Sequence, residues 1–128
     1  MVKRTCMLIG AAMLSVGMSA TASAGTQSEV GYAPGSLGVS AILSGDYSAA
    51  AERLNSLEGA TKRDPARLIN LGNAYAGMGR TYDAERAYRK AMKSMPVDLL
   101  LADGSVASSR DIAMEALSRL PRTTYASR

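Results

Sequence analysis

The chain has 128 residues and a formal net charge of +4, with one cysteine and no histidine. This length accommodates one small domain. Without histidine, the most common general base and metal ligand are both missing, and the carboxylates are scattered at spacings typical of helix surfaces. The sequence therefore predicts no catalytic residue, no metal site and no cofactor, and so a protein that is not an enzyme.

The N-terminus has the order of a secretory signal peptide. Residues 1–4 carry two positive charges, residues 5–20 are uncharged and largely apolar, and the small residues Ala22-Ser23-Ala24 follow. This order predicts a signal peptide over residues 1–24 and an exported, periplasmic protein. An uncleaved membrane anchor is the alternative, but the apolar run is shorter than the roughly 20 residues that span a bilayer.

Cleavage after Ala24 would change the charge and the redox chemistry of the chain. Loss of Lys3 and Arg4 lowers the formal charge to +2, and loss of Cys6 removes the only thiol. A disulfide scaffold is then excluded, and a nucleic-acid partner loses its main electrostatic support. We therefore expect no nucleic-acid partner, and no stable membrane insertion after cleavage.

Residues 25–35 are polar, rich in glycine and interrupted by Pro34. Such a segment has no periodic apolar positions, so we expect a flexible lead-in that contributes little to the fold. The predicted helical domain then covers residues 36–120, and residues 121–128 form a C-terminal tail.

Within the predicted domain the sequence repeats with a period of 34 residues. Leu37-Gly38 recurs as Leu71-Gly72, Gly45 as Gly79, and Ala50 as Ala84. A period of this length is typical of repeats built from two antiparallel helices. In the first copy, Ser36 is expected to cap a short helix that ends at Leu43, and a turn at Gly45-Asp46 leads to a second helix over residues 47–57.

The second copy has clearer helical periodicity. Its first helix places apolar residues on one stripe, namely Leu68, Leu71, Tyr75 and Met78, and its second helix has a face of small and aromatic residues, namely Ala84, Ala87, Tyr88, Ala91 and Met92. Gly72 and Ala84 are expected to let the two helices touch, Gly79 falls at the turn between them, and Pro96 ends the second helix.

Residues 65–96 resemble a tetratricopeptide repeat. The family pattern of Trp, Leu-Gly, Tyr, Ala, aromatic and Pro is matched at the family spacing by Leu71-Gly72, Tyr75, Ala84, Tyr88 and Pro96, while Leu68 stands where Trp is usual. The upstream copy departs further, with Ala41 in place of the Tyr and Lys62 in place of the Pro. The resemblance implies an all-α superhelix of about two repeats with a capping helix, and a protein or peptide partner.

The family pattern ends at Pro96. Asp103-Gly104 lies between apolar residues and predicts a short hairpin over residues 99–107 with a two-residue turn, and a helical or looped segment remains the alternative. A last helix is predicted over residues 109–120, with capping-box chemistry from Ser108 and Asp111. This helix would cover the open end of the repeats.

The resemblance also implies where a partner would bind. Asn70 and Asn73 fall on the concave face that the first helices of such repeats form, and an amide there can pair with the backbone of an extended peptide. Both asparagines also belong to the general repeat consensus, so a purely structural role is the alternative.

Four basic residues share one face of the second helix, namely Arg86, Arg89, Lys90 and Lys93. They could meet an acidic partner or an anionic membrane, and a solvated outer face is the alternative. We therefore expect a protein-protein interaction module that binds a protein or peptide in the periplasm. The alternative is a structural or self-associating repeat protein without a defined peptide groove, so a homo-oligomer remains open.

Overall fold

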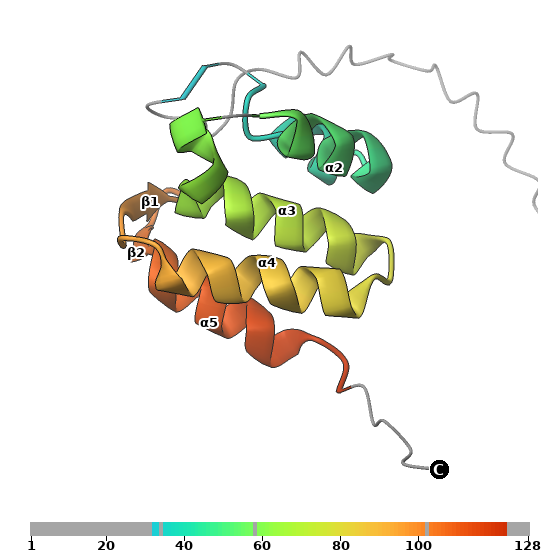
Figure 1. Ribbon diagram of the computed structural model, residues 1–128. Coiled ribbons are helices and arrows are strands. Elements are labelled where there is room, and N and C mark those ends of the chain that lie inside the picture. Colours follow the sequence, from blue (N-terminus) through green and yellow to red (C-terminus); the bar gives the residue numbers. More distant parts are fainter. Residues whose placement is uncertain (1–31, 34, 58, 102, 123–128) are drawn as a thin grey trace, which may run out of the picture.

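A computed structural model describes residues 32, 33, 35–57, 59–101 and 103–122 (Figure 1). The predicted signal peptide, most of the predicted lead-in and most of the predicted tail lie outside these residues. The fold is mostly helical with one small two-stranded sheet, which confirms the expected helical class and the hairpin.

The elements follow the order expected from the repeat. They are α1 (Val39–Leu43), α2 (Tyr47–Ser56), the 3-10 helix η1 (Gly59–Arg63), α3 (Pro65–Gly77), α4 (Thr81–Lys93), β1 (Asp98–Leu100), β2 (Val106–Ser108) and α5 (Ser109–Arg119). Helices α2, α3, α4 and α5 form a stack in chain order (Figure 1), and α5 packs against α4 and also touches α3. The last helix therefore covers the end of the stack, as predicted.

One turn geometry occurs twice, 34 residues apart. After α1, Gly45 has a φ of +79° and its N–H donates to the Ile42 carbonyl at 3.1 Å. After α3, Gly79 has a φ of +72° and its N–H donates to the Ala76 carbonyl at 2.9 Å. The next N–H, from Asp46 or Arg80, donates to the carbonyl five residues back, at 2.8 Å in both turns. Glycine suits this position because a left-handed backbone costs it nothing sterically.

Aspartate side chains cap two of the helices, α2 and α3. The Asp46 carboxylate accepts a hydrogen bond from the Ala49 N–H at 3.1 Å, and the Asp64 carboxylate accepts one from the Arg67 N–H at 2.9 Å. Each bond satisfies a backbone donor in the first turn that has no partner within the helix.

The two predicted serine caps were wrong. Helix α1 begins after Gly38, which has a left-handed backbone, and the hydroxyl of Ser36 is buried without a hydrogen-bond partner. Ser108 does stand at the N-cap of α5, but its side chain makes no capping hydrogen bond. In both cases the backbone conformation, rather than the residue type, decides whether the serine hydroxyl can accept a hydrogen bond from the first turn of the helix.

At Gly72, the close contact between α3 and α4 is made with the Tyr88 ring. A Cβ atom on Gly72 would lie 2.4 Å from the Tyr88 ring, so only a glycine fits under the aromatic side chain. Ala84 is fully buried, but Gly72 meets the larger residue one turn further along α4.

The apolar core has two parts that join across α3 and α4. One part lies between α2, α3 and α4 and includes Ala50, Leu54, Leu71, Ala74 and Ala87. The other joins α3 and α4 to α5 and the hairpin and includes Leu68, Ile69, Ala91 and Ala113. The many alanines allow neighbouring helix axes to approach closely.

A buried cation joins the first helix pair to the second. The side chain of Arg67 is almost fully buried, and its Nε donates to the Leu54 carbonyl near the end of α2 at 2.6 Å. Its Nη1 also donates to the Lys62 carbonyl at 3.3 Å. Burial lowers the pKa of Arg67, and the nearby Asp64 carboxylate offsets part of this effect. A positive group here satisfies a carbonyl at the negative end of α2.

The hairpin is paired as Asp98–Ser108, Leu99–Ala107 and Leu100–Val106, but its turn is longer than predicted. The Gly104 N–H donates to the Leu101 carbonyl at 2.9 Å, and the Leu101 N–H donates to the Ser105 carbonyl at 2.8 Å. Gly104 has a φ of +82°, so the connection is a wider turn that ends in a left-handed glycine. The predicted two-residue turn at Asp103-Gly104 was therefore wrong.

The Gly72–Tyr88 contact predicts a large effect from a single methyl group. Gly72→Ala should lower the free energy of unfolding by roughly 1 to 3 kcal/mol, because the new Cβ overlaps the ring. Urea unfolding followed by circular dichroism measures the change. Combining Gly72→Ala with Tyr88→Leu tests the cause, since the double variant should lose less stability than the two single losses together. Additive losses would show that the methyl group and the ring do not compete for space.

Candidate functional site

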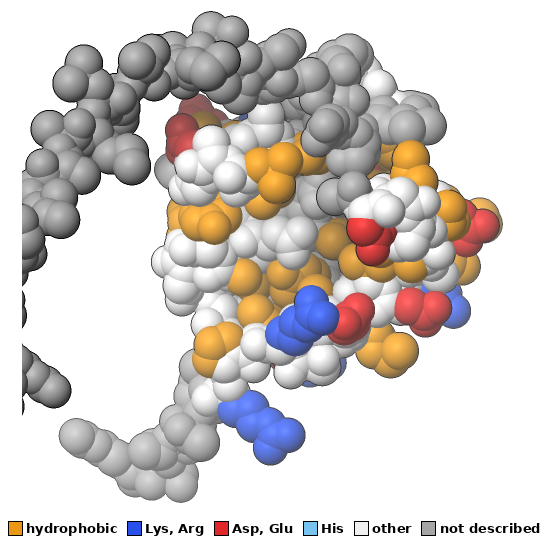
Figure 2. Space-filling model, turned by 180° about the vertical axis from the view of Figure 1, so that it is seen from behind, with side chains coloured by type: hydrophobic (Ala, Val, Ile, Leu, Met, Phe, Trp, Pro, Cys, Tyr) orange, Lys and Arg blue, Asp and Glu red, His pale blue; other side chains and the backbone are white. Residues whose placement is uncertain are grey.

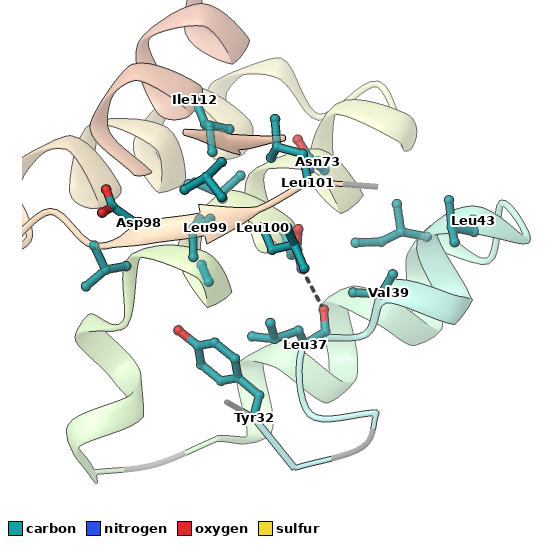
Figure 3. Close-up of a pocket in the computed structure, with 16 residues that line it drawn as sticks. Tyr32, Leu37, Val39, Leu43, Asn73, Asp98, Leu99, Leu100, Leu101 and Ile112 are labelled. Carbon is teal, nitrogen blue, oxygen red and sulfur yellow. Dashed lines mark hydrogen bonds between the residues drawn. The ribbon is translucent and has the colours of Figure 1, made fainter. Parts of the chain in front are cut away.

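An apolar groove lies between α1, the middle of α3, the hairpin and α5 (Figure 3). Its volume is about 550 Å³, and most of its lining is aliphatic. The residues that line it are Tyr32, Leu37, Val39, Ile42, Leu43, Ala66, Ile69, Asn70, Asn73, Val97, Asp98, Leu99, Leu100, Leu101, Val106 and Ile112. Asp98 is the only charged residue among them.

The edges of the groove expose large apolar side chains. Leu43 on α1 is 74% exposed, Val106 on β2 is 64% exposed and Leu100 on β1 is 43% exposed. Seen from behind, hydrophobic side chains are spread over much of the face, with charged side chains both between them and at the margin (Figure 2). Exposed aliphatic side chains around a concave apolar surface are typical of a binding site for a protein or peptide.

The two predicted asparagines both line this groove, and each is partly used within the protein. Asn70 donates from Nδ2 to the Leu37 carbonyl at 3.0 Å, and Asn73 accepts from the Tyr88 hydroxyl at 2.7 Å. The carbonyl oxygen of Asn70 and the amide nitrogen of Asn73 have no hydrogen bond to a described residue. One free acceptor and one free donor thus remain one helical turn apart on α3.

One described residue of the predicted lead-in, Tyr32, reaches the groove. Tyr32 lines the groove, and its hydroxyl donates to the Asp64 carboxylate at 2.9 Å. Burial, together with this hydrogen bond to a carboxylate, raises the pKa of Tyr32 to about 12. This hydrogen bond joins the segment that precedes α1 to Asp64, the N-cap residue of α3.

Strand β1 presents an open backbone edge at the groove. Hydrogen bonds join Leu101 to Ser105 and Ser109 to Val97, each at 2.8 Å. Because hydrogen-bonded pairs alternate along an antiparallel ladder, Asp98 and Leu100 point their N–H and C=O groups away from β2. All three residues of β1 line the groove, whereas β2 contributes only Val106.

A reciprocal pair of hydrogen bonds fixes the base of the hairpin to α5. The Ser109 N–H donates to the Val97 carbonyl at 2.8 Å, and the Val97 N–H donates to the Ser109 hydroxyl at 3.1 Å. Ser109 is fully buried. This pair therefore determines where the β1 wall lies relative to the helices.

The four predicted basic residues of α4 have different neighbours. Arg89 forms an ion pair with Glu85 at 2.7 Å, and the Arg86 guanidinium lies 5.8 Å from the centre of the Tyr82 ring. Lys90 and Lys93 instead line a separate hollow with residues of η1 and the start of α3. All four are exposed, and none of them lines the apolar groove.

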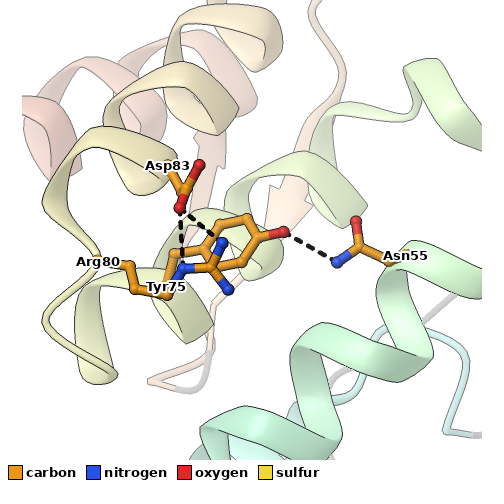
Figure 4. A network of polar contacts seen from close by, with 4 residues as sticks. All are labelled: Asn55, Tyr75, Arg80 and Asp83. Atoms are coloured by element: carbon orange, nitrogen blue, oxygen red, sulfur yellow. Dashed lines mark hydrogen bonds and ion pairs between the residues drawn. The ribbon is translucent and has the colours of Figure 1, made fainter.

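A polar network supports the other side of the α3–α4 unit (Figure 4). The Asn55 amide donates to the Tyr75 hydroxyl at 2.9 Å, and the Arg80 guanidinium lies 4.5 Å from the centre of the Tyr75 ring. Arg80 also forms an ion pair with Asp83 at 2.7 Å. The network joins α2 to the turn between α3 and α4. These contacts give the four side chains a role in packing the helices together.

Comparison with known proteins gives no relative, since no family model, no curated protein and no solved structure matches the chain. No helix in the described ranges is long and apolar enough to cross a membrane. Within the same ranges, no cluster of three or more histidine, cysteine or acidic side chains is placed to hold a metal ion.

Sequence reasoning missed most of the groove. It identified Asn70 and Asn73, but it gave no role to Tyr32, to the exposed side chain of Leu43 or to the leucines of β1. The run Leu99-Leu100-Leu101 was the available signal, because three consecutive leucines in so short a hairpin cannot all be buried.

The Val97–Ser109 pair predicts unequal effects at two adjacent serines. Ser109→Ala should lower the free energy of unfolding by about 1 kcal/mol, because the Val97 N–H loses its acceptor. Ser108→Ala is the matched control and should leave stability unchanged, since the Ser108 hydroxyl makes no capping bond. Urea unfolding of both variants provides the comparison, and equal losses would contradict the assignment.

The buried phenol of Tyr88 predicts a loss of stability in strong base. Burial raises the pKa of Tyr88 from 10.0 to about 12, so the folded protein holds this proton more tightly than the unfolded chain. The resulting stabilisation is complete below pH 10 and declines between pH 10 and pH 12. At pH 11 the loss should be about 1.4 kcal/mol relative to pH 9.

The Tyr88→Phe variant isolates this contribution from that of the other tyrosines. Unfolding free energies of both proteins at pH 9 and pH 11 should show a smaller pH-dependent loss in the variant. The same loss in both proteins would mean that Tyr88 titrates normally in the folded state.

Proposed function

We propose that this protein is a tetratricopeptide-like repeat protein that binds an extended apolar segment of a partner protein in the groove between α1, α3, the hairpin and α5. The observation that carries the proposal is the aliphatic groove with exposed edges at Leu43, Leu100 and Val106. Such a surface costs free energy in water, and a partner that covers it recovers the hydrophobic contribution.

The repeat assignment is supported by the backbone as well as by the sequence period. The turns at Gly45 and Gly79 use the same hydrogen bonds 34 residues apart, and the residues after them, Asp46 and Arg80, have nearly identical backbone angles. The groove lies on the side of α1, α3 and α5, which are the first helices of successive units in this scheme.

An extended ligand is favoured by the polar groups that remain free in the groove. Asp98 and Leu100 offer backbone N–H and C=O groups at an open strand edge, where an extended peptide can add a strand. On the facing helix, the carbonyl oxygen of Asn70 and the amide nitrogen of Asn73 supply one acceptor and one donor. A peptide backbone needs this combination, and its apolar side chains would contact the aliphatic walls.

Binding is favoured over catalysis by the chemistry of the lining. The groove contains one carboxylate, Asp98, and no second titratable group beside it other than the tyrosine phenol at Tyr32. In our proposal the protein acts after export to the periplasm, which rests on the signal-peptide pattern in residues 1–24.

Affinity capture with paired variants tests this function. The bait carries either Leu100→Asp in the groove or Met114→Asp on α5, and both sites are about half exposed. We expect a partner recovered by the wild type to be lost with Leu100→Asp and kept with Met114→Asp, because a carboxylate in the groove must be desolvated on binding. Circular dichroism melts check that both variants are folded.

Self-association of the protein is the other outcome to be distinguished. Sedimentation velocity of the wild type would then show a dimer that Leu100→Asp dissociates, and the capture experiment would recover no heterologous partner that depends on the groove. Equal recovery of one partner by both variants would contradict binding in the groove.

A further inference from the structure

A second hollow, distinct in character from the apolar groove, lies between η1, the first turn of α3 and the C-terminal end of α4. Its volume is about 730 Å³. Four basic side chains line it, Lys62 and Arg63 from η1 and Lys90 and Lys93 from α4. The fold brings these two pairs together from segments that are far apart in the sequence.

The positive charge of this hollow is not neutralised within the described residues. Ion pairs form at Arg80, Arg89 and Arg119, but none forms at the four residues of the hollow. Asp64, the residue after Arg63, accepts hydrogen bonds from the Tyr32 hydroxyl and the Arg67 N–H, and its single negative charge cannot balance four positive ones. Several unpaired like charges around one concavity attract an anionic ligand.

The four basic residues of the hollow lie at the C-terminal ends of two helices. Lys90 and Lys93 lie in the last turn of α4, where positive charge is favourable near the free carbonyl groups. Lys62 and Arg63 likewise lie in the last turn of η1. The ends of two separate helices therefore bring four basic side chains to one hollow.

The floor of the hollow is apolar. Pro65 and Leu68 line it and are buried, and Met95, which is 84% exposed, lines it as well. A flat, charged surface such as a membrane cannot reach a buried floor, whereas a single side chain can enter the hollow. The ligand that fits best combines one apolar side chain with flanking negative charges.

We infer that this hollow binds an acidic peptide segment, with an apolar side chain on the floor at Leu68 and flanking carboxylates beside the lysines and Arg63. Charge complementarity carries this inference, which does not depend on binding in the apolar groove. Val97 lines both cavities, so one partner chain can continue from the groove into the hollow.

Fluorescence anisotropy with labelled peptides tests the inference on the purified protein. The probe is a peptide of about ten residues with one central leucine flanked by glutamates, and the comparison peptide has glutamine in place of every glutamate. We expect the glutamate peptide to bind at least about tenfold more tightly, and its affinity to fall as salt is raised. Equal affinity for the two peptides would overturn the inference.

Matched charge reversals locate the binding site. The double substitution Lys90→Glu and Lys93→Glu should weaken the glutamate peptide by about tenfold, because two attractive contacts become repulsive. Lys62→Glu with Arg63→Glu should have the same effect from the other side of the hollow. Arg86→Glu with Arg89→Glu makes the same change of net charge on α4 outside the hollow, and it should leave affinity within about twofold.

Three further results would overturn the inference. Equal weakening by all three pairs would indicate only a response to net charge. Loss of binding with Leu100→Asp, but not with the reversals in the hollow, would place the acidic peptide in the apolar groove. Binding to vesicles with about one-third anionic phospholipid, abolished by the hollow reversals while the peptide does not bind, would assign the hollow to membranes instead. Circular dichroism melts confirm that each variant is folded.

Discussion

The contact between Gly72 and the Tyr88 ring determines how closely α3 and α4 approach, and the other elements pack against this pair. Helix α2 packs against α3, and α5 covers α4. The same tyrosine reaches across with its hydroxyl to Asn73, so one side chain sets both the helix spacing and the orientation of a polar group in the groove. A contact that fixes packing and surface chemistry together leaves little freedom for either to vary alone.

Single hydrogen bonds between distant segments place the walls around this central pair. Arg67 holds the end of α2 through the Leu54 carbonyl, and Asn70 holds the approach to α1 through the Leu37 carbonyl. Ser109 fixes the base of the hairpin through Val97. Each of these side chains pairs with a backbone group of a segment distant in the sequence. The apolar groove is therefore defined by polar contacts at its margins.

The helices of the second unit could be predicted from sequence because their apolar spacing and the 34-residue period gave the same answer. The contact of Gly72 with Tyr88 could not be predicted in this way. The 34-residue period identifies equivalent positions in the two copies, but it does not show which side chain of α4 faces α3. Ser36 and Ser108 were predicted as caps from residue type alone, but capping depends on backbone angles. The Asp103-Gly104 pair predicted a hairpin correctly and its turn incorrectly, because the pair suits more than one turn. The clustering of Lys62 with Lys93 depends on tertiary packing and has no local signal.

Helix α1 differs from the other walls of the groove in how little holds it in place. It has five residues, none of them buried, and its N-cap at Gly38 supplies no side-chain hydrogen bond. A helix of this length does not persist in water without tertiary contacts. Local opening of α1 therefore costs less free energy than global unfolding, and its amides should exchange with solvent before those of α3. In the proposed binding function, local opening of α1 would change the width of the groove at one wall and leave the α3–α4 core intact.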